Sequence, residues 1–229
     1  MTELTEKTST SLRAMVYQTL ADEGRAPSPG ELARRLALPP SQVQAGLRTL
    51  AQRHALVLAR DGDAIRMAHP FSAAPMAFVV TPADGRDDRR WWGGCAWDSF
   101  GISAALGLDV LIDTACPGCG SRLQVATGPK TPPPGELAVW FPRPAAQWWD
   151  DVVATCTDIR LFCDTAHAQI WAQDTGQHLG QIVPAAQVWA LAAPWYGDRL
   201  TATFRPHSRE HNQRLLNDLG LSGSFWQLP

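Results

Sequence analysis

The sequence lacks a strong charge bias and lacks any long apolar run. Its 20 Lys and Arg nearly balance 22 Asp and Glu, for a net charge of −2, so no bulk electric field favours nucleic acid or a membrane surface. No apolar run is long enough to cross a bilayer, and residues 1–7 are polar, without the apolar core of a secretory signal. These absences predict a soluble, cytoplasmic protein without a membrane partner.

Cysteine and tyrosine are scarce, whereas tryptophan is plentiful. The five cysteines are an odd number, and disulfides do not persist in a reducing compartment, so free thiols are expected. Only two tyrosines accompany ten tryptophans. Six tryptophans cluster in the middle of the chain: Trp91, Trp92, Trp97, Trp140, Trp148 and Trp149. Most of these rings are expected in the core, and those near a thiol could form the wall of an apolar pocket.

Residues 1–70 predict three helices followed by a β-hairpin. Apolar residues recur at helical spacing over 10–21. Ser28-Pro29-Gly30-Glu31 combines a capping serine, a proline in the first turn and a glutamate suited to a capping box. Another helix follows Pro40, and Asp61-Gly62 favours a hairpin turn between two apolar segments. This order is typical of a winged-helix domain.

The charge of this region argues against DNA binding. Residues 1–70 hold nine Lys or Arg and seven Asp or Glu, a net charge of +2. Only Arg48 and Arg53 lie on the helix that would enter the major groove, whereas DNA-binding surfaces carry a clustered basic patch.

The remainder predicts a mixed α/β core with short strands, so the fold class is α+β. Residues 70–75 contain two prolines and small residues typical of a linker, which divides the chain into a winged-helix-like domain (1–70) and a catalytic core (76–229). Strands are predicted at 76–80, 108–112, 122–126, 137–141 and 159–162, and helices at 184–191 and 208–219.

The stretch from Arg90 to Gly101 contains the most informative residues. A short helix is predicted from Cys95 to Gly107, because the segment lacks proline and ends at a glycine. Cys95 and Asp98 would share one face of that helix, and the helix dipole would favour the thiolate. A plainer interpretation is that Cys95 is a buried apolar residue and Asp98 an ordinary first-turn acid. Trp92 and Trp97 flank the thiol and are candidate substrate-pocket residues.

These residues resemble the organomercurial (alkylmercury) lyase family. The likeness rests on Arg89-Arg90-x4-Cys95-x2-Asp98, followed by Cys116 and by a late cysteine, Cys156, in a predicted strand segment. It implies that Cys95 and Cys156 hold mercury, that Asp98 handles the proton and that Cys116 is structural. The usual aromatic residue before the late cysteine and histidine four residues after it are here Thr155 and Arg160.

The resemblance implies protonolysis of a carbon–mercury bond, giving a hydrocarbon and Hg(II) without an organic cofactor. Mercury is soft and binds thiolates far better than oxygen or nitrogen ligands. A nearby carboxyl can carry a proton from an incoming thiol to the carbon. The Hg(II) product would remain on Cys95 and Cys156 until a thiol acceptor or a mercuric reductase receives it.

A second interpretation is a zinc-stabilised binding module or a metal-responsive regulator. Cys116-Pro117-Gly118-Cys119 has the C-x2-C spacing of a metal knuckle, so Cys116 and Cys119 are candidate structural-metal ligands. Cys163 and His167 could complete the set. Cys163 could equally be a core residue, because it shares strand parity with Ile159 and Leu161.

Overall fold

The computed structural model describes residues 6–62, 64–85, 88–177 and 180–229, and its fold class is α+β. Three helices come first: α1 (Glu6–Glu23), α2 (Pro29–Leu36) and α3 (Pro40–Gln52). Ser28 caps α2, its Oγ accepting the Glu31 amide. The predicted order of three helices and a hairpin is therefore present, whereas the likeness to a winged helix stays a prediction. Asp63, which follows the predicted Asp61-Gly62 turn, lies outside the described residues.

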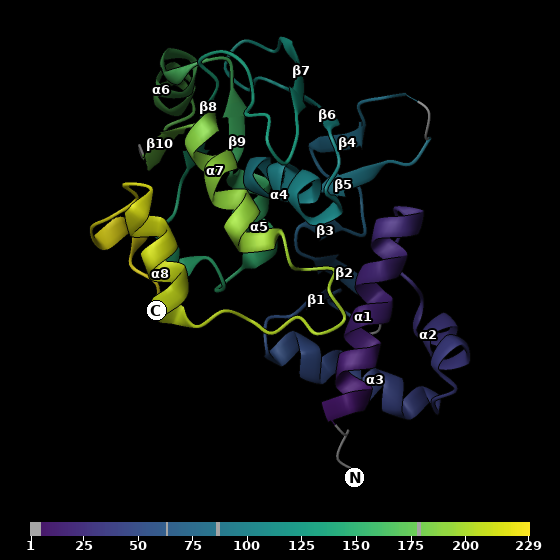
Figure 1. The fold of residues 1–229 in the computed structure, drawn as a ribbon. Helices are drawn as coiled ribbons and strands as arrows, with labels where there is room; N and C mark the ends of the chain where they lie inside the picture. Colours follow the sequence, from purple (N-terminus) through teal and green to yellow (C-terminus); the bar gives the residue numbers. More distant parts are fainter. Residues whose placement is uncertain (1–5, 63, 86–87, 178–179) are drawn as a thin grey trace.

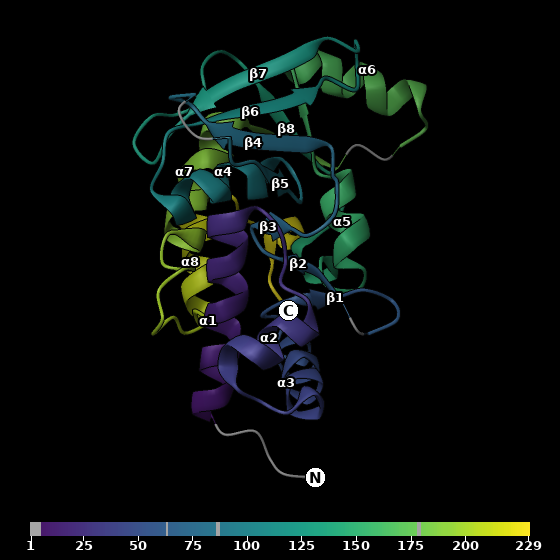
Figure 2. The same cartoon turned by 90° about the vertical axis from the view of Figure 1, so that its right-hand side faces the viewer.

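A seven-stranded antiparallel sheet follows in the order β1-β2-β3-β5-β4-β6-β7. Its strands are β1 (Val57–Leu58), β2 (Ile65–Ala68), β3 (Phe71–Ser72), β4 (Phe78–Pro82), β5 (Trp91–Gly93), β6 (Val110–Ala115) and β7 (Arg122–Thr127). Figure 2 shows them descending from β7 to β1, beside the first helices. The stretch interpreted as a linker contains β3, which pairs with β2 and β5; the division into two domains stays a prediction.

A smaller antiparallel sheet has the order β10-β8-β9. It comprises β8 (Ala138–Phe141), β9 (Arg160–Phe162) and β10 (Gln181–Pro184). The helices of this half are α4 (Ala96–Leu106), α5 (Val152–Asp158), α6 (Thr165–Asp174), α7 (Ala185–Tyr196) and α8 (Arg209–Asp218), with 3-10 turns η1 (Ala145–Gln147) and η2 (Ser224–Trp226). In Figure 1, α6 lies beside the small sheet and α7 beside α4.

Helix α4 is the central element of the core. It contacts α7 and the strands β3, β4 and β5, and nearly all its residues are buried, as expected of a helix that is apolar on every side. Gly107 ends it with a φ of 66°, which a glycine adopts without strain. The predicted helix is confirmed, and its N-terminus is held inside the molecule.

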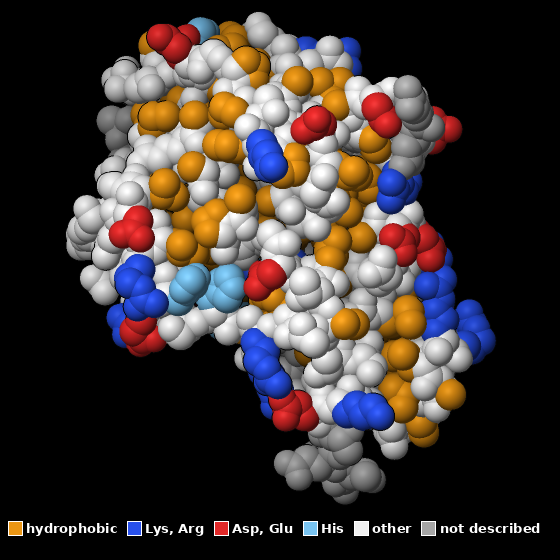
Figure 3. All heavy atoms as spheres, in the orientation of Figure 1, with side chains coloured by type: hydrophobic (Ala, Val, Ile, Leu, Met, Phe, Trp, Pro, Cys, Tyr) orange, Lys and Arg blue, Asp and Glu red, His pale blue; other side chains and the backbone are white. Residues whose placement is uncertain are grey.

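No helix in the described parts of the chain is long and apolar enough to cross a membrane. On the face drawn in Figure 3, acidic and basic side chains alternate among apolar ones, so neither sign of charge dominates that face.

Candidate active site

Cys95 caps helix α4 and Asp98 lies in its first turn. The Cys95 Sγ accepts the Asp98 amide at 3.3 Å, and Ser99 Oγ donates to the Cys95 carbonyl at 2.7 Å. Cys95 and Asp98 are each 1% exposed. The close approach requires a glycine before the thiol, because a Cβ on Gly94 would lie 2.4 Å from the Asp98 Oδ2. The predicted shared face of the two side chains is present.

Cys156 meets this pair from a different element. It lies on α5, a helix, so the expectation that it opens a strand was wrong. The Asp151 side chain accepts the Ala154 amide and caps α5, and β9 begins only at Arg160. The Cys156 Sγ donates to the Asp98 Oδ2 at 3.6 Å, and Cys95 and Cys156 both line the same pocket. The two distant cysteines and the acid therefore meet in one place.

The environment raises the pKa values of both thiols. Burial is the main cause of the raised pKa of Cys95, and the Asp98 charge adds to it. The hydrogen bond with Cys95, together with burial, raises the pKa of Cys156 well above its usual value. The expectation that the helix dipole yields a thiolate at Cys95 was therefore wrong, because desolvation outweighs the dipole here. Each thiol keeps a proton that it can give up when a metal binds.

Two further side chains complete the group, and sequence reasoning missed both. Tyr196, at the end of α7, donates from its hydroxyl to the Asp98 Oδ1 at 2.7 Å, and burial raises its pKa well above the usual value. The predicted helix stopped at residue 191, whereas α7 continues through Pro194 to Tyr196. His69 places its Nε2 3.4 Å from the Cys156 Sγ; burial lowers its pKa, so the ring is neutral. No motif marks His69.

A pocket of about 90 Å³ opens at this group. Its apolar walls include Trp97, Trp148, Trp149 and Trp195. Trp97 packs edge-on against Trp148 and Trp195, with ring centroids 5.5 and 4.9 Å away. Trp92 is absent from the lining, contrary to expectation. Side chains alternate along β5, and its neighbour Trp91 is the one that turns into the core, donating to the Leu20 carbonyl of α1.

Three polar atoms of the pocket lining are buried without a hydrogen-bond partner among the described residues. They are the Trp97 Nε1, the Thr155 Oγ1 and the Arg199 Nε. Unsatisfied buried polar groups cost about 1–3 kcal/mol each, and such groups in a native fold call for a functional explanation.

Cys116, Cys119 and Cys163 form a separate group, and their sulfurs lie within 4.8 Å of one another. His167 is not part of it, because neither of its ring nitrogens lies within 4.8 Å of all three sulfurs; its Nδ1 pairs with the Asp164 carboxylate at 2.9 Å. Hydrogen bonds from Ser121 lower the pKa of Cys119 to about 7. The position of the Cys163 sulfur beside those of Cys116 and Cys119 favours the interpretation of Cys163 as a third possible metal ligand over that of a core residue alone.

The site brings two thiols and one carboxyl group together beside one pocket, a set of ligands suited to a soft metal. Residues 71–197 match the model of the alkylmercury lyase family, so the chain belongs to that family and is a carbon–mercury lyase. The crystal structure of the mercury-bound form of MerB2 superposes with a TM-score of 0.64, at 22% identity, over 87% of this chain and 94% of that one. No curated protein sequence matches this chain.

Proposed function

We propose that Cys95, Cys156 and Asp98 carry out the carbon–mercury cleavage of this lyase. The observation that supports the assignment most directly is that Asp98 contacts both cysteines, through its carboxylate and its amide, in the lining of one pocket. The two thiols come from different helices and can bind one mercury atom from two sides. Mercury prefers such sulfur ligands over every oxygen and nitrogen donor nearby.

The reaction begins when an R–Hg⁺ group meets the first thiol. A sulfur–mercury bond forms, and the thiol proton passes to the Asp98 carboxylate, which lies 3.6 Å from the Cys156 sulfur. The second thiol then binds mercury and releases its own proton. Two electron-rich sulfurs on the metal push electron density onto the carbon and make it basic.

Asp98 next delivers its proton to that carbon, and the carbon–mercury bond breaks. The balance is R–Hg⁺ plus two thiols giving R–H, Hg(II) bound to two sulfurs, and one H⁺. Every proton comes from side chains of the chain, so the scheme uses no organic cofactor. Tyr196 holds the acid by its 2.7 Å hydrogen bond, and the tryptophan walls exclude water from the carbon.

The Hg(II) product leaves by exchange onto other thiols, since sulfur ligands compete best for it. A low-molecular-weight thiol or the cysteines of a mercuric reductase would receive the ion. This step suits a cytoplasmic setting, where free thiols persist. All five cysteines of the chain are free, in agreement with such a setting.

Headspace gas chromatography of purified protein with methylmercury and phenylmercury tests the assignment. Release of methane and benzene is expected. Cys95→Ser and Cys156→Ser should each abolish it, and Asp98→Asn should slow it about 100-fold or more. Asp113→Asn, at a carboxylate on β6 outside the pocket lining, is the matched control and should keep full activity. Activity that survives in both serine variants would disprove the assignment.

A further inference from the structure

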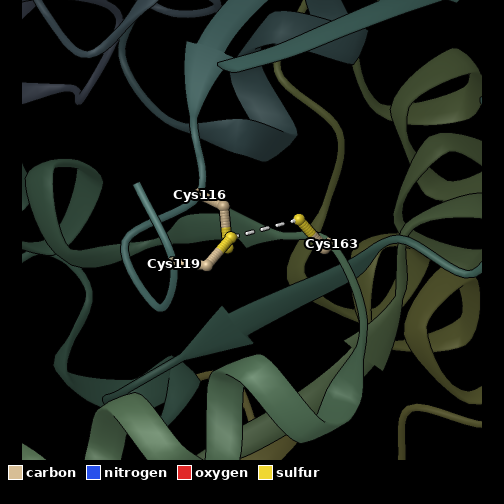
Figure 4. A group of neighbouring side chains, drawn as sticks. All are labelled: Cys116, Cys119 and Cys163. Carbon is tan, nitrogen blue, oxygen red and sulfur yellow. Dashed lines mark hydrogen bonds between the residues drawn. The ribbon is translucent and has the colours of Figure 1, made fainter. Parts of the chain in front are cut away.

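Three cysteines gather outside the lining of the pocket that contains Cys95 and Cys156. Cys116 and Cys119 lie in the turn after β6, and Cys163 directly follows β9 (Figure 4). The sulfurs of Cys119 and Cys163 are 3.7 Å apart, and all three lie within 4.8 Å of one another. Cys116 is buried, Cys163 half-buried and Cys119 exposed, so the group opens to solvent on one side.

The backbone holds this turn in a fixed shape. The Gly120 amide donates to the Cys116 carbonyl at 2.8 Å, and the Cys116 amide donates to the Ser121 carbonyl at 2.9 Å. Gly118 packs so tightly on α6 that an added Cβ would lie 2.7 Å from the His167 carbonyl oxygen. The fixed turn therefore holds the sulfurs of Cys116 and Cys119 close together without a ligand. Cys163, just after β9, lies beside them.

We propose that Cys116, Cys119 and Cys163 bind a structural Zn²⁺ ion. A tetrahedral zinc–thiolate site with Zn–S bonds of about 2.3 Å places its sulfurs about 3.8 Å apart, which is close to the separation of the Cys119 and Cys163 sulfurs. A C-x2-C turn supplies two ligands in many structural zinc sites, which usually hold four protein ligands. Here the described residues supply three thiols, so a water molecule would take the fourth position on the open side, next to Cys119.

The ion joins the two sheets. Cys116 and Cys119 extend from β6 of the large sheet, and Cys163 extends from β9 of the small one. Beneath the sulfurs the contact is otherwise apolar, between Cys116, Trp140 and Phe162. Ile159, the residue before β9, contacts the start of α4, where the Ala96 amide donates to the Ile159 carbonyl at 3.3 Å. Zinc therefore fixes the strand that follows the helix of Cys156.

Metal analysis of protein purified under reducing conditions tests the proposal. About one zinc ion per chain is expected, falling at least tenfold in Cys119→Ser and in Cys163→Ser. Cys95→Ser, which removes a buried thiol of the catalytic pair, is the matched control and should keep its zinc. Zinc-free protein that stays zinc-free after reduction and incubation with ZnCl2 would overturn the proposal, as would equal zinc loss in the Cys95→Ser control.

Cobalt substitution gives a readout that does not depend on the variants. Wild-type protein loaded with Co²⁺ should show thiolate-to-metal charge-transfer bands and the intense visible bands of a tetrahedral ion. Removing zinc with a chelator should lower the melting temperature by about 5 °C or more. An octahedral cobalt spectrum, an unchanged melting temperature or a Cys119–Cys163 disulfide in the freshly reduced, zinc-treated protein would each contradict the proposal.

Discussion

At the scale of single residues, the site consists of buried polar side chains that hydrogen-bond to one another in place of water. Asp98 is 1% exposed and contacts Tyr196 and Cys156. A buried carboxylate needs such partners because it has lost its water. In the proposed mechanism, the Asp98 oxygens that carry the proton are therefore the same atoms that these hydrogen bonds stabilise.

Tyr196→Phe should lower turnover about tenfold, because Asp98 loses the donor that fixes its position. The effect should appear in kcat, with the fold intact by circular dichroism. Thr127→Val is the matched control, since that buried hydroxyl donates to the Thr131 carbonyl at 2.8 Å and lies outside the pocket lining. It should cost about 1 kcal/mol of stability without changing kcat. Equal kcat values in Tyr196→Phe and wild type would contradict the assigned role.

His69 predicts a pH dependence of stability. Burial lowers its pKa, so below about pH 6.5 the unfolded chain takes up a proton that the folded protein refuses. This contribution to stability is present above that pH and is lost as the pH falls, by at most about 1.4 kcal/mol per pH unit.

Urea denaturation between about pH 7.5 and 5 should show a smaller loss of stability in His69→Gln than in wild type. His211→Gln, on α8, is the control and should follow the wild-type profile. Identical pH slopes in all three proteins would show that His69 does not carry the effect.

At the scale of elements, the N-terminus of α4 is built by close packing. A Cβ on Gly94 would lie 2.4 Å from both the Asp98 Oδ2 and the Met67 Cε. The methionine could move, but the carboxylate is held by Tyr196 and Cys156. The glycine before the thiol is therefore a condition for placing the acid beside the sulfur.

Gly94→Ala should destabilise the protein by about 1–3 kcal/mol and lower activity more than stability alone explains, because Asp98 is displaced. Thermal unfolding and initial rates at a temperature where the variant is folded measure the two effects. Gly30→Ala, in the first turn of α2, meets only the end of the Arg34 side chain at 3.7 Å and should be neutral. A Gly94→Ala variant with wild-type rates would contradict the packing argument.

At the scale of the whole molecule, the pocket lies where the helices of both halves of the chain meet. Trp149 is 38% exposed at its edge and stacks on His54, which follows α3, with ring centroids 4.0 Å apart. The pocket volume of about 90 Å³ is smaller than the roughly 150 Å³ cavity that accepts benzene in an engineered protein. Small alkyl groups should therefore fit more easily than aryl groups.

Trp149→Ala should raise kcat/KM for phenylmercury relative to methylmercury, because it widens the pocket at its open edge. Competition between the two substrates, followed by benzene and methane release, measures the ratio directly. Ile170→Ala, an exposed residue on α6, should leave the ratio unchanged. A lower ratio of the kcat/KM for phenylmercury to that for methylmercury in Trp149→Ala than in wild type would contradict this view of the pocket.

Local patterns in the sequence determined the helix starts at Ser28 and Cys95 and most of the strands. Helix capping, hydrophobic periodicity and turn preferences each depend on residues close together in the sequence, so they can be recognised from the sequence alone. The proximity of Cys95 and Asp98 was also predictable from the sequence, because residues three apart on a helix share one face. The family resemblance added Cys156, though on the wrong element.

Only the tertiary structure decided which distant groups meet. His69 and Tyr196 reach Asp98 and Cys156 through packing of β2, α4, α5 and α7, and no local pattern encodes such contacts. It also reversed the expected ionisation of Cys95, because the desolvation of a thiol depends on everything packed around it and not on its place in a helix. Packing also places Cys163 beside Cys116 and Cys119, because the end of β9 in the small sheet lies next to the end of β6 in the large one.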